Sequence, residues 1–344
     1  MNFLACDLGG TKVLLGIYER VKDSSIPKLV LKEKYFSNEW DSLYSILDDF
    51  FSKKPLDISI LKSACFAIAG PIKDENCKLT NLPWNISKVE LKNKLKLNSI
   101  ELINDFAVLI YGIPFLDRNQ FQTIQIGEES LVNNKLHTIV GAGTGLGISR
   151  GLINSDNIEI LSSEGGHIEF APKNSKEWEL KVWLKKFLNL ERISCERIIS
   201  GEGLCNIAKW RFSYSDVVNH SFQNILNASK TSEEAKKELA SKICKFSEKG
   251  EPVLREIESI WLSNYASYLG DVALHELCYG GLWIAGGTAP KHFKNFKSDS
   301  FLKHFSDKGR YKDILKCIPV RVILDEEFGL FSAACRAKML LKTS

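Results

Sequence analysis

Short apolar runs separated by polar or glycine-rich turns dominate the first third of the chain. Residues 2–6 are apolar over the length of a strand, residues 7–11 have the composition of a turn, and residues 12–18 are apolar again. This pattern predicts a β-hairpin with two adjacent glycines at its tip. Two more short apolar runs, 64–69 and 101–103, stop at turn-forming residues and predict buried strands.

The second half of the chain repeats this arrangement. The apolar run 136–140 leads into a turn rich in alternating glycines at 141–147, and residues 148–153 follow as a second run. Further strands are predicted at 282–285 and 320–324. The two predicted hairpins lie more than a hundred residues apart, and their similarity points to two related α/β halves.

Apolar residues at helical spacing predict four amphipathic helices, at 40–53, 231–249, 250–279 and 331–341. Strands alternating with helices favour an α/β fold. A chain of 344 residues exceeds an ordinary single-core domain, so we expect two domains.

Composition and charge exclude several classes of protein. With 44% apolar and 26% charged residues, the chain is neither disordered nor fibrous. A net charge of +4 is too small and too dispersed for a nucleic-acid or membrane-surface binder. No apolar run approaches the ~20 residues of a membrane span, and the N-terminus lacks a secretory signal pattern. Nine scattered cysteines without a C-x-x-C pair predict reduced thiols in the cytoplasm.

The two glycine-rich turns carry the first candidate chemistry. Glycines let backbone N–H groups approach an anion closely, which suits phosphate. Neither turn fits the P-loop pattern, and Leu146 occupies the place of the third glycine in a dinucleotide-binding turn. Asp7 precedes the first turn, where a carboxylate could hold Mg²⁺ directly or through water. The alternative is that both turns are ordinary tight hairpins.

Two polar segments carry the second candidate chemistry. Asn104 and Asp105 follow a predicted strand, where the carboxylate could accept a proton from a substrate hydroxyl. Alternatively, the pair forms a turn or helix cap. Glu164 and His167 flank two glycines and could form hydrogen-bonding walls around a polyhydroxylated ligand. A metal site or a plain polar turn is the alternative there, and Glu196 is uninformative when considered alone.

Taken together, these segments resemble the bacterial glucokinases of the hexokinase/actin-like ATPase superfamily nearly end to end. Matching segments occur in the family's order: Asp7-Leu-Gly-Gly-Thr11, Leu79-Thr-Asn-Leu-Pro-Trp84, Leu102-Ile-Asn-Asp-Phe-Ala107, Gly141-Ala-Gly-Thr-Gly-Leu-Gly147, Ser163-Glu-Gly-Gly-His-Ile-Glu-Phe-Ala-Pro172, Cys195-Glu-Arg-Ile-Ile-Ser-Gly201, Ile284-Ala-Gly-Gly287 and Asp307-Lys-Gly-Arg310. The resemblance implies two actin-like ATPase (ribonuclease H-like) α/β domains flanking a cleft. It places a small domain at 1–110 with a C-terminal helix at 328–344, and a large domain at 111–327.

The resemblance also implies roles for individual residues. Asp105 would be the general base for the 6-hydroxyl of D-glucose, and Mg²⁺ would sit beside Asp7, through water. The other sugar-binding residues would be Asn81, Asn104, Glu164, His167 and Glu196. The residues lining ATP would be Gly9, Gly10, Thr11, Gly143, Thr144 and Gly145 at the phosphates and Gly286 and Gly287 at the adenosine. A homodimer is implied as well, without nucleic-acid or membrane partners.

Three alternatives to glucose phosphorylation stay open: a kinase of another hexose or amino sugar such as fructose or mannose, a non-catalytic sugar sensor, and an actin-like structural protein. Residues 172–197 lack the cysteine-rich zinc cluster of the related repressor–kinase group, so we expect no structural zinc. Lys12 follows the first motif where some glucokinases carry asparagine, and its role is open.

Overall fold

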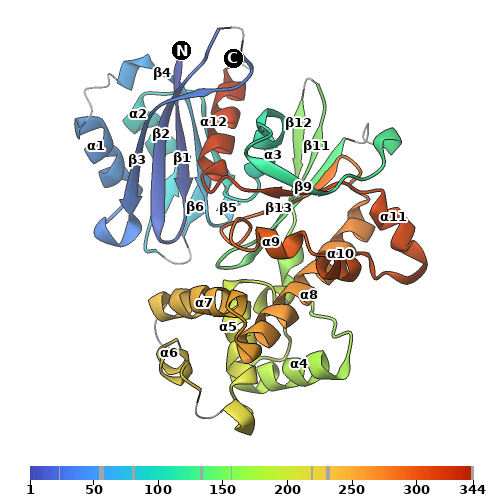
Figure 1. The fold of residues 1–344 in the computed structure, drawn as a ribbon. Helices are drawn as coiled ribbons and strands as arrows, with labels where there is room; N and C mark the ends of the chain where they lie inside the picture. Colours follow the sequence, from blue (N-terminus) through green and yellow to red (C-terminus); the bar gives the residue numbers. More distant parts are fainter. Residues whose placement is uncertain are drawn as a thin grey trace. The chain divides into compact units, whose positions relative to one another are not determined.

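The chain folds into two compact units, each assembled from separate segments. The computed structural model describes residues 1–22, 24–53, 58–79, 82–131, 135–155, 157–217, 220–229 and 233–341 (Figure 1). The first unit comprises residues 1–121, 149–162 and 325–344, and the second comprises 122–148 and 163–324.

A five-stranded sheet forms the centre of the first unit. Its strands, in the order β3-β2-β1-β4-β8, are β1 (Asn2–Leu8), β2 (Lys12–Glu19), β3 (Lys28–Phe36), β4 (Leu61–Ile68) and β8 (Ile100–Asn104). β1 runs antiparallel to β2 and parallel to β4, and β4 runs parallel to β8. The carboxyl ends of β1, β4 and β8 therefore lie at one edge of the sheet.

Helices cover both faces of this sheet, which explains why β1 is buried almost throughout. Leu4, Cys6 and Leu8 share an apolar cluster with residues of α1 (Leu43–Lys53) and α2 (Lys88–Leu95). The helix α12 (Phe328–Leu340), drawn in red in Figure 1, packs against β1 and β4, and α3 (Leu109–Gly112) packs against α12. A small sheet of β5 (Ile72–Lys73), β6 (Asn76–Lys78) and β7 (Asn85–Ser87) completes the unit.

The second sheet repeats the strand order of the first. Its order is β12-β11-β10-β13-β14-β9, with β9 (Phe121–Gln125), β10 (Leu136–Ala142), β11 (Leu146–Ile153), β12 (Ile158–Leu161), β13 (Gly281–Ala285) and β14 (Val320–Ile323). β10, like β1, forms a hairpin with the next strand and pairs in parallel with β13, which pairs in parallel with β14. This shared order supports the two related halves predicted from the sequence.

A long central helix organises the second unit. α8 (Pro252–Glu276) packs against α5, α7 and α10, and its Trp261 and Leu269 are fully buried in the unit's core. The side chain of Glu251 caps its first turn by accepting from Leu254 N. The other helices are α4 (Ser175–Leu188), α5 (Gly201–Arg211), α6 (Gln223–Ala228), α7 (Glu233–Glu248), α9 (Phe293–Phe296), α10 (Asp299–Ser306) and α11 (Lys312–Lys316).

The elements differ from the sequence predictions mainly at their ends. The helix predicted at 40–53 begins at Leu43, the one at 250–279 spans Pro252–Glu276, and the one at 331–341 begins at Phe328. Residues 231–232 of the predicted helix 231–249, and 342–344 at the C-terminus, lie outside the described residues. No described helix has the length and apolar content needed to cross a membrane.

The compact units also differ from the predicted domains, 1–110 with 328–344 and 111–327. Residues 111–121 and 149–162 belong to the first unit. A Cβ at Gly151 would lie 2.4 Å from Ile110 Cγ2, and one at Gly112 would lie 2.3 Å from Ser332 Oγ. The segment 149–162 therefore packs tightly on α3, which packs tightly on α12, and this close packing joins all three segments in one unit.

Candidate active site

Parallel strand ends bring the first two candidate residues to one edge of the first unit. Asp7 pairs with Ala67, and Ile68 pairs with Asn104. Asp105 follows directly, and its N–H donates to Ile68 O at 3.0 Å. Residues 7 and 105, far apart in the sequence, therefore sit at the carboxyl ends of strands in one sheet.

The surroundings of these two carboxyl groups disfavour their charged forms. Burial, followed by the charge of Asp105, raises the pKa of Asp7 to about 6, and the Lys12 ammonium acts in the opposite direction. Burial also raises the pKa of Asp105, although the N–H groups of Phe106 and Asp105 oppose the shift. Two carboxylates in a partly buried place attract a divalent cation, and their oxygens are ligands that Mg²⁺ prefers.

Gly329 in the first turn of α12 makes room for Asp7. A Cβ at this position would lie 2.8 Å from Asp7 Oδ2 and 3.1 Å from Asp7 Cγ. Only a residue without a side chain lets the helix approach the carboxylate this closely. Gly329 was not among the predicted site residues. The available signal was a glycine just inside the start of an apolar helix, where capping does not require one.

Asn104 has a structural role in placing Asp105. Its Oδ1 accepts from Phe106 N at 3.0 Å and from Ala107 N at 3.1 Å. The cap considered as an alternative from the sequence is therefore present. The carbonyl oxygen is committed to this turn, so the amide nitrogen is the part of Asn104 suited to donate to a ligand hydroxyl.

The first glycine turn is tied to the loop that follows β3. Gly9 N donates to Lys12 O at 3.0 Å, and Ser37 N donates to Thr11 O at 3.1 Å. Ser37 Oγ also donates to Gly9 O at 3.4 Å. Gly10 and Thr11 are exposed, so the tip of the hairpin is accessible from solvent.

The second glycine turn is tied to the start of α5 within the second unit. Gly143 N donates to Gly145 O at 2.8 Å, and Gly201 N donates to Gly143 O at 2.8 Å. A Cβ at Gly143 would meet nothing within 4 Å. This turn is therefore open on one side and lies beside a helix N-terminus, where partial positive charge favours anions.

Gly286 and Gly287, the glycines predicted to line the adenosine, follow a strand next to the one that leads into this turn. β10 and β13 run in parallel with Gly141 opposite Ala285, so the residues that follow both strands share one edge. Thr288 Oγ1 donates to Ala142 O at 2.6 Å. Gly286 has a φ of +87°, a conformation that favours glycine, and Gly287 faces open space.

The second unit also gathers three of the predicted sugar-binding residues. His167 Nε2 lies 3.8 Å from Glu164 Oε2, and His167 Nδ1 lies 4.0 Å from Glu196 Oε1. Cys195 N donates to Ile168 O at 2.8 Å, which holds the two segments side by side. The result is a cluster of two carboxylates and an imidazole that can bond to several hydroxyl groups.

Glu196 joins this cluster to the second glycine turn. Its Oε2 accepts from Leu146 N at 3.0 Å, and a Cβ at Gly145 would lie 2.5 Å from the same oxygen. A Cβ at Gly166 would lie 2.0 Å from Leu146 O. Glycines at these two positions thus let the cluster and the turn pack together, a contact that spacing in the sequence did not predict.

Comparison with known proteins places this arrangement in one family. The family model described as Glucokinase matches residues 4–340. The glucokinase of Synechocystis sp. is 36% identical over 355 residues, covering 98% of each chain. The chain belongs to the glucokinase family. The predicted family is therefore confirmed, and at the level of the family so is the predicted phosphorylation of glucose.

Solved structures of glucokinases have the same fold. A glucokinase from an Antarctic psychrotroph superimposes with a TM-score of 0.78 at 26% identity, covering 98% of this chain and 99% of that chain. A ROK family glucokinase from Streptomyces griseus, in complex with glucose and AMPPNP, gives a TM-score of 0.61 at 18% identity, covering 98% and 100%. The predicted actin-like ATPase fold class is confirmed.

Among the predicted site residues, the structure groups six in the first unit and eight in the second. The first group is Asp7, Gly9, Gly10, Thr11, Asn104 and Asp105; the second is Gly143, Thr144, Gly145, Glu164, His167, Glu196, Gly286 and Gly287. Asn81 lies outside the described residues.

Proposed function

We propose that this member of the glucokinase family transfers the γ-phosphoryl group of ATP to the 6-hydroxyl of D-glucose, with Asp105 as the general base. The observation that carries this proposal is the position of Asp105. Its backbone is bonded to Ile68 O at 3.0 Å, and its carboxylate lies near that of Asp7 at one edge of the sheet.

Asp105 is suited to accept the proton of the attacking hydroxyl. Phosphoryl transfer asks a protein mainly for positioning and charge stabilisation, with one carboxylate to orient the nucleophile. Burial raises the pKa of Asp105, which makes its carboxylate a stronger proton acceptor once it is ionised. The turn capped by Asn104 fixes this group on a rigid strand end.

The residues around Asp7 fit a magnesium ion, held directly or through water. Asp7 and Asp105 raise each other's energy when both are charged, and the glycine at position 329 leaves the Asp7 carboxylate close to a helix start. When bound, Mg²⁺ neutralises charge on the phosphate oxygens. The exposed backbone of Gly10 and the Thr11 hydroxyl would donate hydrogen bonds to those oxygens.

The second unit supplies the remaining binding groups. Glu164, His167 and Glu196 would bind sugar hydroxyls, and the family resemblance assigns the same role to Asn104 and Asn81. Residues 143–145 would donate to phosphate oxygens beside the N-terminus of α5, and Gly286 and Gly287 would approach the adenosine. The complex of the Streptomyces griseus protein with glucose and AMPPNP supports this choice of ligands.

We also propose a homodimer in the cytoplasm. All nine cysteines lie in the described part of the chain, where they are unpaired, and seven of them are buried. Unpaired thiols are typical of reducing compartments. The dimer rests on the family resemblance, and sedimentation of the purified chain measures it.

A coupled assay for glucose 6-phosphate tests the proposed reaction. With ATP and Mg²⁺ we expect glucose to give a higher kcat/KM than fructose, mannose or N-acetylglucosamine. ADP and polyphosphate serve as alternative donors, and a chelator of Mg²⁺ should abolish turnover. A markedly higher kcat/KM on another sugar, or equal turnover with another donor, would contradict the assignment.

A further inference from the structure

Three side chains that the proposed reaction does not use converge inside the second unit. Cys244 comes from α7, Glu258 from α8, and His292 from the segment between β13 and α9. One ligand atom from each lies within 4.8 Å of the other two. We propose that Cys244, Glu258 and His292 form a binding site for a thiophilic divalent cation such as Zn²⁺.

The distances within this trio suit a shared metal ion. Cys244 Sγ lies 3.4 Å from His292 Nε2, and His292 Nδ1 lies 3.1 Å from Glu258 Oε1. Two ligands bound tetrahedrally to one zinc ion, with Zn–N and Zn–S bonds of about 2.0–2.3 Å, stand roughly 3.3–3.6 Å apart. Only one ring nitrogen of His292 can bind a given ion. The spacing of Nδ1 and Glu258 Oε1 is close to that of two ligands on one ion, and Cys244 Sγ, which lies beside Nε2, would have to rotate toward Nδ1 to complete the set.

A buried and unsatisfied ring nitrogen provides an independent indication of a missing ligand. The side chain of His292 is 3% exposed. Its Nδ1 makes no hydrogen bond with any described residue, because the nearby Glu258 oxygen is poorly aligned with it. Leaving such an atom unpaired costs about 1–3 kcal/mol. Coordination of the imidazole to a cation, with realignment of the Glu258 carboxylate, would remove this cost.

Neighbouring groups already hold the candidate ligands in place. Ser247 Oγ donates to Glu258 Oε2 at 2.5 Å, and Asn295 Nδ2 donates to Glu258 Oε1 at 3.1 Å. The ring of Trp261 lies against that of His292, with centroids 4.7 Å apart. Such outer contacts orient metal ligands and are typical of built metal sites.

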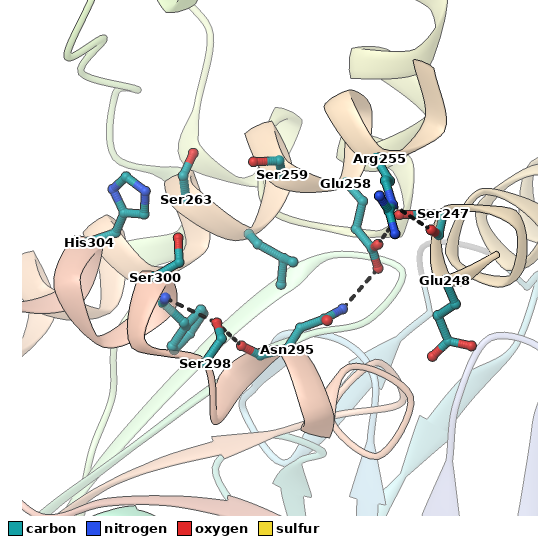
Figure 2. Close-up of a pocket in the computed structure, with 12 residues that line it drawn as sticks. Ser247, Glu248, Arg255, Glu258, Ser259, Ser263, Asn295, Ser298, Ser300 and His304 are labelled. Atoms are coloured by element: carbon teal, nitrogen blue, oxygen red, sulfur yellow. Dashed lines mark hydrogen bonds between the residues drawn. The ribbon is translucent and has the colours of Figure 1, made fainter. Parts of the chain in front are cut away.

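A polar cavity adjoins one member of this trio, Glu258. The cavity has a volume of about 320 Å³ and is lined by Glu258, Ser247 and Asn295 together with further serines and Arg255. Figure 2 shows the Glu258 side chain between Ser247 and Asn295, with dashed lines to both. Glu258 thus faces the cavity while it also approaches His292.

Coordination by a thiol releases the thiol proton, so binding at this site depends on pH. Metal binding replaces the proton of Cys244, as Cys–SH + M²⁺ gives Cys–S⁻–M²⁺ + H⁺, so the affinity should fall as the pH falls.

Titration of the metal-free full-length protein with Co²⁺ tests the proposal. Thiolate coordination should produce a sulfur-to-cobalt charge-transfer band in the near ultraviolet at one equivalent, and Zn²⁺ should remove it. Cys244→Ser should abolish the band. His292→Gln and Glu258→Gln should each weaken binding at least about tenfold. Circular dichroism of each variant shows whether the fold is retained.

Cys317→Ser is the matched control, because Cys317 is a partly exposed cysteine of the same unit whose Sγ bonds to Asp313 O at 3.3 Å. It should retain the full band. The proposal is overturned if no thiolate band appears in the wild-type protein, if folded Cys244→Ser keeps it, or if Cys317→Ser loses it. These spectra do not depend on kinase activity, so neither outcome bears on the proposed reaction.

Discussion

The two glycine turns share a backbone plan but differ in what surrounds them. The first turn follows β1, is tied to Ser37, and lies beside the carboxylates of Asp7 and Asp105. The second follows β10, is tied to Gly201 at the start of α5, and touches Glu196. The first is therefore an acidic neighbourhood suited to a cation, and the second offers helix N–H groups suited to an anion.

This difference shows that a repeated hairpin can serve two roles. A sequence motif specifies the turn, while the partners that packing brings to the turn decide which charge it favours.

Removing the proposed general base beside the first glycine turn should cause the largest loss of activity. We expect Asp105→Ala to lower kcat about 10²–10⁴-fold with little change in glucose binding. The wild-type kcat should also fall as the pH drops through the raised pKa of Asp105, because a base must be ionised. The residual activity of the variant should lack this acid limb. The exposed Asp41, changed to asparagine, is the control; a loss within a factor of a few would remove Asp105 from the mechanism.

Adding one methyl group to the second glycine turn should weaken glucose binding at Gly145 but not at Gly143. In Gly145→Ala the new Cβ would lie 2.5 Å from Glu196 Oε2, so Glu196 must leave its bond to Leu146 N. Loss of a charged hydrogen bond of about 1.5–3 kcal/mol should raise the KM for glucose roughly 10–100-fold. Gly143→Ala, where a Cβ meets nothing within 4 Å, is the matched control and should leave the KM for glucose unchanged. Equal KM values in the two variants would contradict a role of the Gly145–Glu196 contact in glucose binding.

The Asp7 carboxyl group beside the first turn should make the thermal stability depend on pH. The folded-state pKa of Asp7 is about 6 against an ordinary 3.8, so its contribution to stability is lost as the pH rises from about 4 to 6. Asp7→Asn should therefore melt about 2–4 °C above the wild type at pH 7 and closer to it at pH 4. Added Mg²⁺ should raise the Tm of the wild type more than that of the variant. A variant less stable at pH 7 would contradict this.

Lys12 should have the smallest effect. Its ammonium lowers the pKa of Asp7. In Lys12→Met, the pH at which the protein loses stability through ionisation of Asp7 should therefore be higher than in the wild type by a fraction of a pH unit. The exposed Lys28, which pairs with Glu19 at 3.2 Å, is a control on the same sheet. An unchanged transition would leave Lys12 without an electrostatic role at Asp7.

Much of the fold could be predicted because apolar periodicity directly encodes strands and helices. The hairpins at residues 2–18 and 136–153 and the strands β4, β8, β13 and β14 follow from this signal. The half-exposed strand β3 and the short β5, β6 and β7 were not predicted, because their apolar residues alternate weakly or are too few. The segment 149–162 was predicted with the large domain, whereas its contacts group it with the first unit, because its packing on α3 is not visible in the sequence.

The site was predictable only where a residue belongs to a motif. Asp105 and the glycine turns could be found from local composition, whereas Glu196 was uninformative without the family resemblance. Its bond to Leu146 N joins residues 50 positions apart. Gly329 lies even further from Asp7 in the sequence, and the need for a missing Cβ appears only when α12 meets β1.

The first sheet is completed by α12, which is far from its strands in the sequence. Ser63 Oγ donates to Ala337 O at 2.6 Å, and Arg336 pairs with Glu101 at 2.7 Å. During synthesis the strands β1 and β4 must wait, with one face uncovered, until α12 has been translated. A premature stop before residue 325 would therefore damage a sheet built from residues 2–104, and such nascent chains should depend on chaperones.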